Sequence, residues 1–174
     1  MLSVRMFNPW ELPAMIACAV ETAMAQLVPR DRPFGTREAV SAQILRMYDA
    51  ALSQPGGTIL VAEEAGEQAE PGTSVLHGWV LLMPQPNPFT GAPELVVMDI
   101  FTAPALRGRG IAKRLLAEAE RHARELGCGS LAAQVALHNR SSLRLFQGAG
   151  YDSERLVVGK SLEPAQDLAG GQAD

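Results

Sequence analysis

Glycines and cations alternate in the stretch LRGRGIAKRLL, residues 106–116, at the start of an amphipathic run. Glycine costs roughly 1 kcal/mol relative to alanine inside a helix, so Gly108 and Gly110 are expected in a turn that precedes one. A glycine-rich turn directs its backbone N–H groups at one spot, and the helix N-terminus adds about half a positive charge there. The stretch is either a basic turn with no ligand or a cradle for a phosphorylated ligand.

Three sequence patterns place such a turn against phosphate groups. The P-loop pattern G-x-x-x-x-G-K-[ST] is absent, and the dinucleotide fingerprint G-x-G-x-x-G fails because Lys113 occupies the position of its third glycine. The third pattern, [QR]-x-x-G-x-[GA], is satisfied by Arg107, Gly110 and Ala112. Because this pattern is short, the elements around it must decide its meaning.

The surrounding elements follow from hydrophobic periodicity and turn residues. Helices are predicted over residues 10–27, 37–53, 111–126 and 140–147, with Thr36 and Asn139 as N-caps. Strands are predicted over residues 2–7, 58–64, 75–83, 94–101, 130–137 and 154–163. A polar loop is expected over residues 65–74, and the four prolines of residues 84–93 predict irregular structure. The pattern indicates a single α/β domain over residues 1–162 and a flexible tail over residues 163–174.

Bulk composition argues against several classes of function. The chain has 174 residues, 47% of them hydrophobic, and its net charge of −4 argues against binding nucleic acid through overall charge. No apolar run approaches the roughly 20 residues of a membrane span. Cys18 and Cys128 match no metal spacing, so no metal site is expected, and they are read as reduced thiols. Glu11 and Glu21 flank the apolar run that could serve as a signal peptide, so a cytoplasmic location is predicted.

Two longer stretches resemble a known family. MDIFTAPALRGRGIAKRLL, residues 98–116, resembles the central motif of the GNAT-type N-acetyltransferases, and ALHNRSSLRLFQGAGY, residues 136–151, resembles their second motif. The order of the predicted elements resembles that family as well. The resemblance implies a mixed α/β (α+β) fold whose mostly antiparallel central sheet has about six or seven strands and is flanked by about four helices. Central strands that splay apart would form the acetyl-CoA cleft.

The same resemblance implies where acetyl-CoA binds. Backbone amides of Gly108 to Lys113 would hold its pyrophosphate, and the backbone of Ile100 to Thr102 would pair with the pantetheine arm as an added strand would. Asn139 would bond the arm, and Arg109, Arg140 or Arg144 would reach the ribose phosphate. The residues implied to bind the cofactor are Ile100, Phe101, Thr102, Arg107, Gly108, Arg109, Gly110, Ile111, Ala112, Lys113, Asn139, Ser142 and Phe146.

Two carboxylates on the strand predicted before the turn, Asp99 and Glu94, are candidate general bases. In the family, a bulge in this strand frees a backbone N–H near Ile100 or Phe101 as an oxyanion donor. Strict alternation of strand side chains would place Glu94 and Asp99 on opposite faces of the sheet. A bulge between them would place both on the same face, so both candidates stay open. Phe146 stands where family members commonly carry a tyrosine that protonates the departing thiolate.

The resemblance therefore implies an N-acetyltransferase that moves the acetyl group of acetyl-CoA directly to a primary amine of a small molecule or peptide, in a ternary complex. The alternative is a catalytically weak or inactive CoA-binding homologue, which the departure at Phe146 keeps open. The acceptor site is expected between the first two helices, with apolar walls from Phe34, Phe89 and Trp79. No nucleic-acid or membrane partner is expected, and a homodimer is left open.

Overall fold

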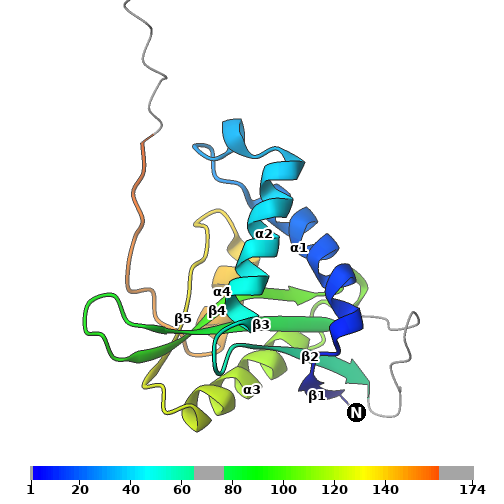
Figure 1. The fold of residues 1–174 in the computed structure, drawn as a ribbon, viewed down its shortest axis with the longest axis vertical. Helices are drawn as coiled ribbons and strands as arrows, with labels where there is room; N and C mark the ends of the chain where they lie inside the picture. Colours follow the sequence, from blue (N-terminus) through cyan, green and yellow to red (C-terminus); the bar gives the residue numbers. More distant parts are fainter. Residues whose placement is uncertain (1, 65–76, 161–174) are drawn as a thin grey trace, which may run out of the picture.

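A five-stranded sheet forms the centre of the computed structural model, which describes residues 2–64 and 77–160 (Figure 1). The strand order is β1-β2-β3-β4-β5. The strands are β1 (Leu2–Met6), β2 (Thr58–Glu64), β3 (Gly78–Pro86), β4 (Pro93–Thr102) and β5 (Ser130–Ala133). Strands β1 to β4 pair antiparallel, whereas β5 pairs parallel with β4. The loop and tail predicted over residues 65–74 and 163–174 lie outside the described residues.

Helices cover both faces of the sheet (Figure 1). Helices α1 (Leu12–Gln26) and α2 (Arg37–Leu52) pack on one face, and α3 (Ile111–Glu125) packs on the other together with α4 (Arg140–Gly148). All four helices agree with the predicted ranges to within two residues at each end. The predicted N-caps are confirmed, because the Thr36 hydroxyl and the Asn139 side chain both accept a backbone N–H of the first helical turn.

The side chains of the strands alternate between two separate cores. In β3, Trp79 and Leu81 pack toward α1 and α2, whereas Val80 and Leu82 pack toward α3. All four side chains are fully buried. Because helices cover both faces, these strands are continuously apolar and lack the polar alternation of a half-exposed sheet.

A β-bulge interrupts the pairing of β4 with β3. Asp99 lies opposite Leu81, but Val97 lies opposite the very next residue of β3, so Met98 is the extra residue. Val97 and Ile100 consequently both join the α3-side core, although three positions separate them. Asp99 therefore faces α1 and α2.

Strands β4 and β5 separate beyond the bulge. Their last paired residues are Val97 and Ala133, and residues 98–102 have no β5 partner within the described chain. Strand β4 still continues to Thr102 because β3 pairs with it along this stretch. One edge of β4 is therefore open on both sides of Asp99, as expected for splayed central strands.

The strand predictions need correction at three places. Residues 84–86 belong to β3 and pair with β4, although their prolines predicted irregular structure. Pairing of β3 with β2 ends at Leu82, so this end of β3 has a free edge, where a sheet tolerates proline. The strand predicted over residues 130–137 ends at Ala133, and residues 154–160 form no strand. The described chain therefore contains five strands, fewer than the six or seven expected.

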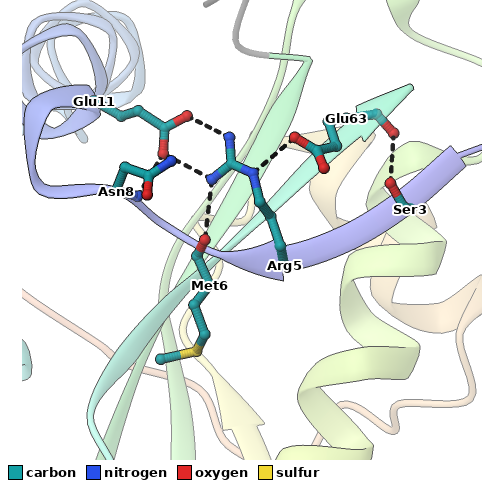
Figure 2. A network of polar contacts seen from close by, with 6 residues as sticks. All are labelled: Ser3, Arg5, Met6, Asn8, Glu11 and Glu63. Atoms are coloured by element: carbon teal, nitrogen blue, oxygen red, sulfur yellow. Dashed lines mark hydrogen bonds and ion pairs between the residues drawn. The ribbon is translucent and has the colours of Figure 1, made fainter. Parts of the chain in front are cut away.

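Arg5 joins β1 to β2 and to the start of α1 through a polar network (Figure 2). Its guanidinium donates to Glu63 at 2.7 Å and to both carboxylate oxygens of Glu11 at 2.7 and 3.0 Å. Glu11 is 2% exposed and also accepts the backbone N–H of Asn8 at 2.7 Å. The hydrogen bond to Glu11 is the largest of the interactions that raise the pKa of Arg5 above its ordinary value. The buried charge of Glu11 therefore depends on Arg5.

We expect Arg5→Met to lower the free energy of unfolding by about 3 kcal/mol, because it removes the guanidinium that offsets the buried charge of Glu11. Methionine keeps much of the apolar stem of arginine. The matched control is Arg37→Met, which breaks the Arg37–Glu21 pair, whose side chains are both 61% exposed. This control should cost less than about 1 kcal/mol. Urea denaturation measures both values, and equal losses would contradict the importance of the network.

Candidate active site

The turn between β4 and α3 contains the two glycines of the motif. Gly108 and Gly110 have φ angles of 80° and 81°, in the left-handed region that side chains rarely adopt. A Cβ atom at either position would meet no heavy atom within 4 Å. The backbone conformation, and not internal packing, therefore requires glycine here, and the space beside the turn is open to a ligand.

Five N–H groups of this turn have no backbone acceptor within the described chain. The first hydrogen bond of α3 runs from the Arg114 N–H to the Gly110 carbonyl at 3.0 Å. The donors left over belong to Gly108, Gly110, Ile111, Ala112 and Lys113. The start of a helix leaves such donors unsatisfied, and the helix dipole favours an anion beside them. The predicted cradle therefore has the geometry of an anion site.

The open edge of β4 leads into this turn. Ile100, Phe101 and Thr102 are half-buried and lie where β5 no longer pairs with β4. The hydroxyl of Thr102 is buried and has no hydrogen-bond partner among the described residues. Arg107 donates from Nε to the Thr102 carbonyl at 3.4 Å, which links the turn to the end of β4. A one-turn 3-10 helix, Pro104–Leu106, joins this open edge of β4 to the glycine turn.

The second motif places Asn139 at the N-cap of α4 and Phe146 within that helix. Asn139 Oδ1 accepts from the Ser142 N–H at 3.1 Å and from the Ser141 hydroxyl at 2.8 Å, while its Nδ2 makes no hydrogen bond to a described residue. Phe146 is 7% exposed and meets the ring of Tyr151 edge-on, with centroids 5.0 Å apart. The Tyr151 hydroxyl is buried without a partner in the described chain, and burial raises the pKa of Tyr151.

Asp99 is held by two aromatic donors. The Tyr48 hydroxyl donates to Asp99 Oδ2 at 2.7 Å, and Trp79 Nε1 lies 3.3 Å from the same oxygen and 2.9 Å from the Tyr48 hydroxyl. Tyr48 is 1% exposed and Trp79 is fully buried. Burial raises the pKa of Asp99 above its ordinary value, and the hydrogen bonds from Tyr48, Trp79 and the Ile100 N–H oppose that rise.

Glu94 lies at the other end of β4, where β5 is still paired. Its Oε1 accepts from Asn87 Nδ2 at 3.1 Å and from the Ser130 hydroxyl at 2.8 Å, and the residue is 8% exposed. Asp99 follows Glu94 by five positions, which is about 16 Å along a strand. Glu94 therefore ties the start of β4 to β5 and to the β3–β4 loop, away from the open edge.

The predicted walls of the acceptor site are only partly supported. Phe34 and Phe89 are 77% and 75% exposed on their loops, as a wall requires. Trp79 is fully buried and stacks on Phe101 with ring centroids 4.2 Å apart, so it does not line an accessible surface. Side chains of β3 alternate between the two faces of the sheet, and that of Trp79 points into the α1–α2 core.

Sequence reasoning does not find Tyr48, although its hydroxyl makes a 2.7 Å hydrogen bond to Asp99. The signal was present in the helical spacing, since Tyr48 follows Ile44 by four residues and Val40 by eight. A tyrosine on the apolar face of a helix usually finds a buried hydrogen-bond partner for its hydroxyl. Its partner could not be named, because Asp99 is 51 residues away in the sequence.

Comparison with known proteins identifies the family. Residues 22–151 match the acetyltransferase (GNAT) family, and the chain belongs to it. YhfO of Bacillus subtilis, named as an uncharacterized N-acetyltransferase, is 30% identical over 133 residues, which are 76% of this chain and 83% of that protein. The family resemblance drawn from the two motifs is thereby confirmed.

Solved structures confirm the fold class. A protein of Pyrococcus furiosus has a TM-score of 0.74 and 19% identity, over 93% of this chain and 100% of its own. AAC(6')-Iy in complex with the bisubstrate analog CoA-S-monomethyl-acetylneamine has a TM-score of 0.59 and 20% identity, over 92% of this chain and 97% of its own. The ligand in that structure of AAC(6')-Iy is derived from CoA.

An aminoglycoside N(6')-acetyltransferase type 1 of Salmonella typhimurium is 28% identical over 85 residues, 49% of this chain and 54% of that protein. The match thus spans about half the length of this relative.

Within residues 2–64 and 77–160, no helix is long and apolar enough to cross a membrane. The same residues contain no group of three or more side chains suited to hold a metal ion.

Proposed function

We propose that the protein is an acetyl-CoA-dependent N-acetyltransferase that acetylates a primary amine of a small molecule or peptide, by direct transfer in a ternary complex. One observation carries the proposal: Asp99 lies beside the bulge of β4, and the open edge of the strand runs from there to the glycine turn. Such a transfer requires a proton acceptor for the amine and an anion cradle for the cofactor. Asp99 and the glycine turn can supply these two parts along one edge of β4.

The residues along this edge fit acetyl-CoA. The N–H groups of Gly110 and of Ile111 to Lys113 offer donors to a pyrophosphate, and residues 100–102 offer backbone groups to an amide-containing arm. The buried Thr102 hydroxyl and Asn139 Nδ2 add two polar groups without partners in the described chain. Acetyl-CoA, when bound, supplies a thioester whose acetyl group can pass to an amine nitrogen.

Asp99 is the proposed general base. It accepts the proton of the acceptor ammonium, directly or through one water, and thereby frees the lone pair of the nitrogen. Tyr48 and Trp79 fix the carboxylate and stabilise its charged form, while burial makes it a stronger proton acceptor than an exposed aspartate. The Ile100 N–H is engaged with Asp99, and Phe101 lies opposite Trp79 in the pairing with β3, so the proposal assigns neither of the two N–H groups expected from the family as the oxyanion donor.

The test is thiol release from acetyl-CoA by the purified protein, against a panel of amines that includes aminoglycosides, polyamines and peptides. Thiol release that depends on one class of amine supports the proposal and names the acceptor class. Tight acetyl-CoA binding in calorimetry without thiol release on any amine would instead support the alternative, a CoA-binding homologue without turnover.

The phenylalanine at position 146 leads to a pH prediction. Phenylalanine cannot donate a proton, and a thiol with a pKa of about 8.5 is a good enough leaving group to depart as thiolate. We therefore expect an active enzyme whose rate rises with pH and shows no falling basic limb up to about pH 10. Phe146→Tyr should introduce such a limb and leave acetyl-CoA affinity unchanged. A basic limb in the unmodified enzyme that Tyr151→Phe removes would identify Tyr151 as the acid and contradict this prediction.

A further inference from the structure

Residues 152–160, the segment that follows α4, touch two loops that are far apart in the sequence. The guanidinium carbon of Arg155 lies 4.1 Å from the ring centroid of Phe89 in the β3–β4 loop. Farther along the segment, Gly159 lies against Arg30 in the α1–α2 loop, because a Cβ there would be 1.9 Å from Arg30 Nη1. The segment therefore bridges the two loops that carry Phe89 and Phe34, the exposed walls of the predicted acceptor site.

The bridging segment and the proposed general base lie on the same side of the sheet. Figure 1 shows the segment, in orange, running along the side of the sheet that carries α1 and α2. Asp99 faces that side as well, since its Oδ2 accepts from the Tyr48 hydroxyl of α2. An amine whose nitrogen reaches Asp99 therefore has its remaining atoms on the side where the segment and the two loops meet.

Apolar side chains are exposed on all three of these connected segments. Leu156, Val157 and Val158 are 63%, 69% and 83% exposed, and Phe34 and Phe89 are exposed on the two loops. A single exposed apolar residue is ordinary on a protein surface, whereas a group of them on connected segments marks a surface that contacts a ligand or partner. The ligand that such a surface fits has an apolar body.

The charges of the same three segments disfavour a polycationic acceptor. Residues 28–36, 84–93 and 152–160 together contain four cations and three carboxylates, a net charge of +1. Two carboxylates on this side already have an arginine partner, Asp31 with Arg30 at 3.3 Å and Glu21 with Arg37 at 2.5 Å. A ligand with several ammonium groups, such as an aminoglycoside or a polyamine, would meet no excess of negative charge there.

We propose that residues 155–159 form a third wall of the acceptor site, and that the site selects a monoamine with an apolar body over a polycation. The inference rests on the proposed function, because it places the reacting ammonium at Asp99. One carboxylate recognises the single positive charge, and the apolar side chains of the three segments cover the body of the ligand. Covering that body favours binding in proportion to the apolar area removed from water.

The test compares octylamine with spermidine, two flexible amines of similar length of which spermidine carries several positive charges. Thiol release from acetyl-CoA should give octylamine a kcat/KM about tenfold or more above that of spermidine. Among simple alkylamines, kcat/KM should rise from ethylamine to octylamine, because the longer chain covers more of the apolar surface. An equal or higher kcat/KM for spermidine would overturn the inference and leave the proposed acetyltransferase activity standing.

A triple variant, Leu156→Ser with Val157→Ser and Val158→Ser, tests the third wall itself. Its kcat/KM for octylamine should fall about tenfold or more. Its kcat/KM for ethylamine and its dissociation constant for acetyl-CoA should not change, because neither ligand needs this wall. An octylamine preference that survives in the triple variant would overturn the inference.

The matched control is Leu126→Ser, which removes an exposed apolar side chain at the end of α3, on the other face of the sheet. It should leave the kcat/KM of both alkylamines unchanged. Calorimetric titration of octylamine and spermidine into the CoA-bound protein separates recognition from transfer. Binding of octylamine alone, without thiol release, would contradict the proposed function and support the third wall. Neither binding nor thiol release with octylamine would contradict both.

Discussion

The Asp99→Asn variant is expected to lose about 10²- to 10⁴-fold in kcat, the usual contribution of a general base. Its dissociation constant for acetyl-CoA should not change. Asparagine keeps the shape of the side chain and an oxygen that can accept from Tyr48 and Trp79, so the fold around it is preserved. Steady-state thiol release measures kcat, and calorimetry measures cofactor affinity.

Glu94→Gln is the control for this prediction. The glutamine oxygen can still accept from Asn87 and Ser130, so kcat should stay within about threefold of the unmodified enzyme. The reverse result, in which Glu94→Gln is inactive and Asp99→Asn is active, would make Glu94 the base.

A pH profile separates a chemical role of Asp99 from a structural one. Tyr48→Phe removes a hydrogen bond that stabilises the charged form of Asp99, so the pKa of Asp99 must rise. The acidic limb of kcat/KM should therefore move to higher pH. Trp79 and the Cys18 thiol of α1 also face this carboxylate and are unchanged in the variant. An acidic limb that stays in place would show that another group accepts the proton.

Gly110→Glu should raise the dissociation constant for acetyl-CoA by about 100-fold or more, because the glutamate brings a negative charge to the proposed phosphate cradle. Its side chain would occupy space that is open beside the turn. The variant also forces a left-handed backbone on a residue with a side chain, which costs roughly 1–2 kcal/mol of stability. Calorimetric titration with acetyl-CoA measures the affinity.

Gly127→Glu is the matched control at the opposite end of α3. Gly127 has a φ of 71°, and a Cβ there also meets no heavy atom within 4 Å. The control therefore carries the same charge and the same backbone strain, but away from the proposed cradle. It should bind acetyl-CoA with unchanged affinity, and an equal loss of affinity in both variants would contradict the cradle.

Features with local causes could be predicted from the sequence. The caps Thr36 and Asn139, the turn at Gly108 and Gly110, and the helix bounds all depend on neighbouring residues. The strand predicted over residues 154–163 is absent from its described part, because a strand, unlike a cap or a turn, depends on residues that are distant in the sequence. Residues 154–160 have a composition typical of strands, but a strand exists only where another strand pairs with it, and the described chain supplies none.

The choice between the candidate bases could not be made from the sequence. Which face Asp99 occupies depends on whether one residue of β4 is left out of the pairing with β3, and that pairing joins distant parts of the chain. The hydrogen bond from Tyr48 depends on the packing of α2 against the sheet. The motif residues could be placed on the right elements, whereas the environment of each carboxylate required the tertiary structure.

Over the described residues, the sheet separates two cores that share no buried side chain. In the proposed enzyme, the cofactor contacts come from the glycine turn, α3 and α4, while Asp99 and its aromatic partners face α1 and α2. Substitutions in α1, α2 and their connecting loop can therefore alter the choice of amine while the cofactor site keeps its geometry. With such an arrangement, duplicated genes can diverge in acceptor preference while each copy keeps a functional acetyl-CoA site.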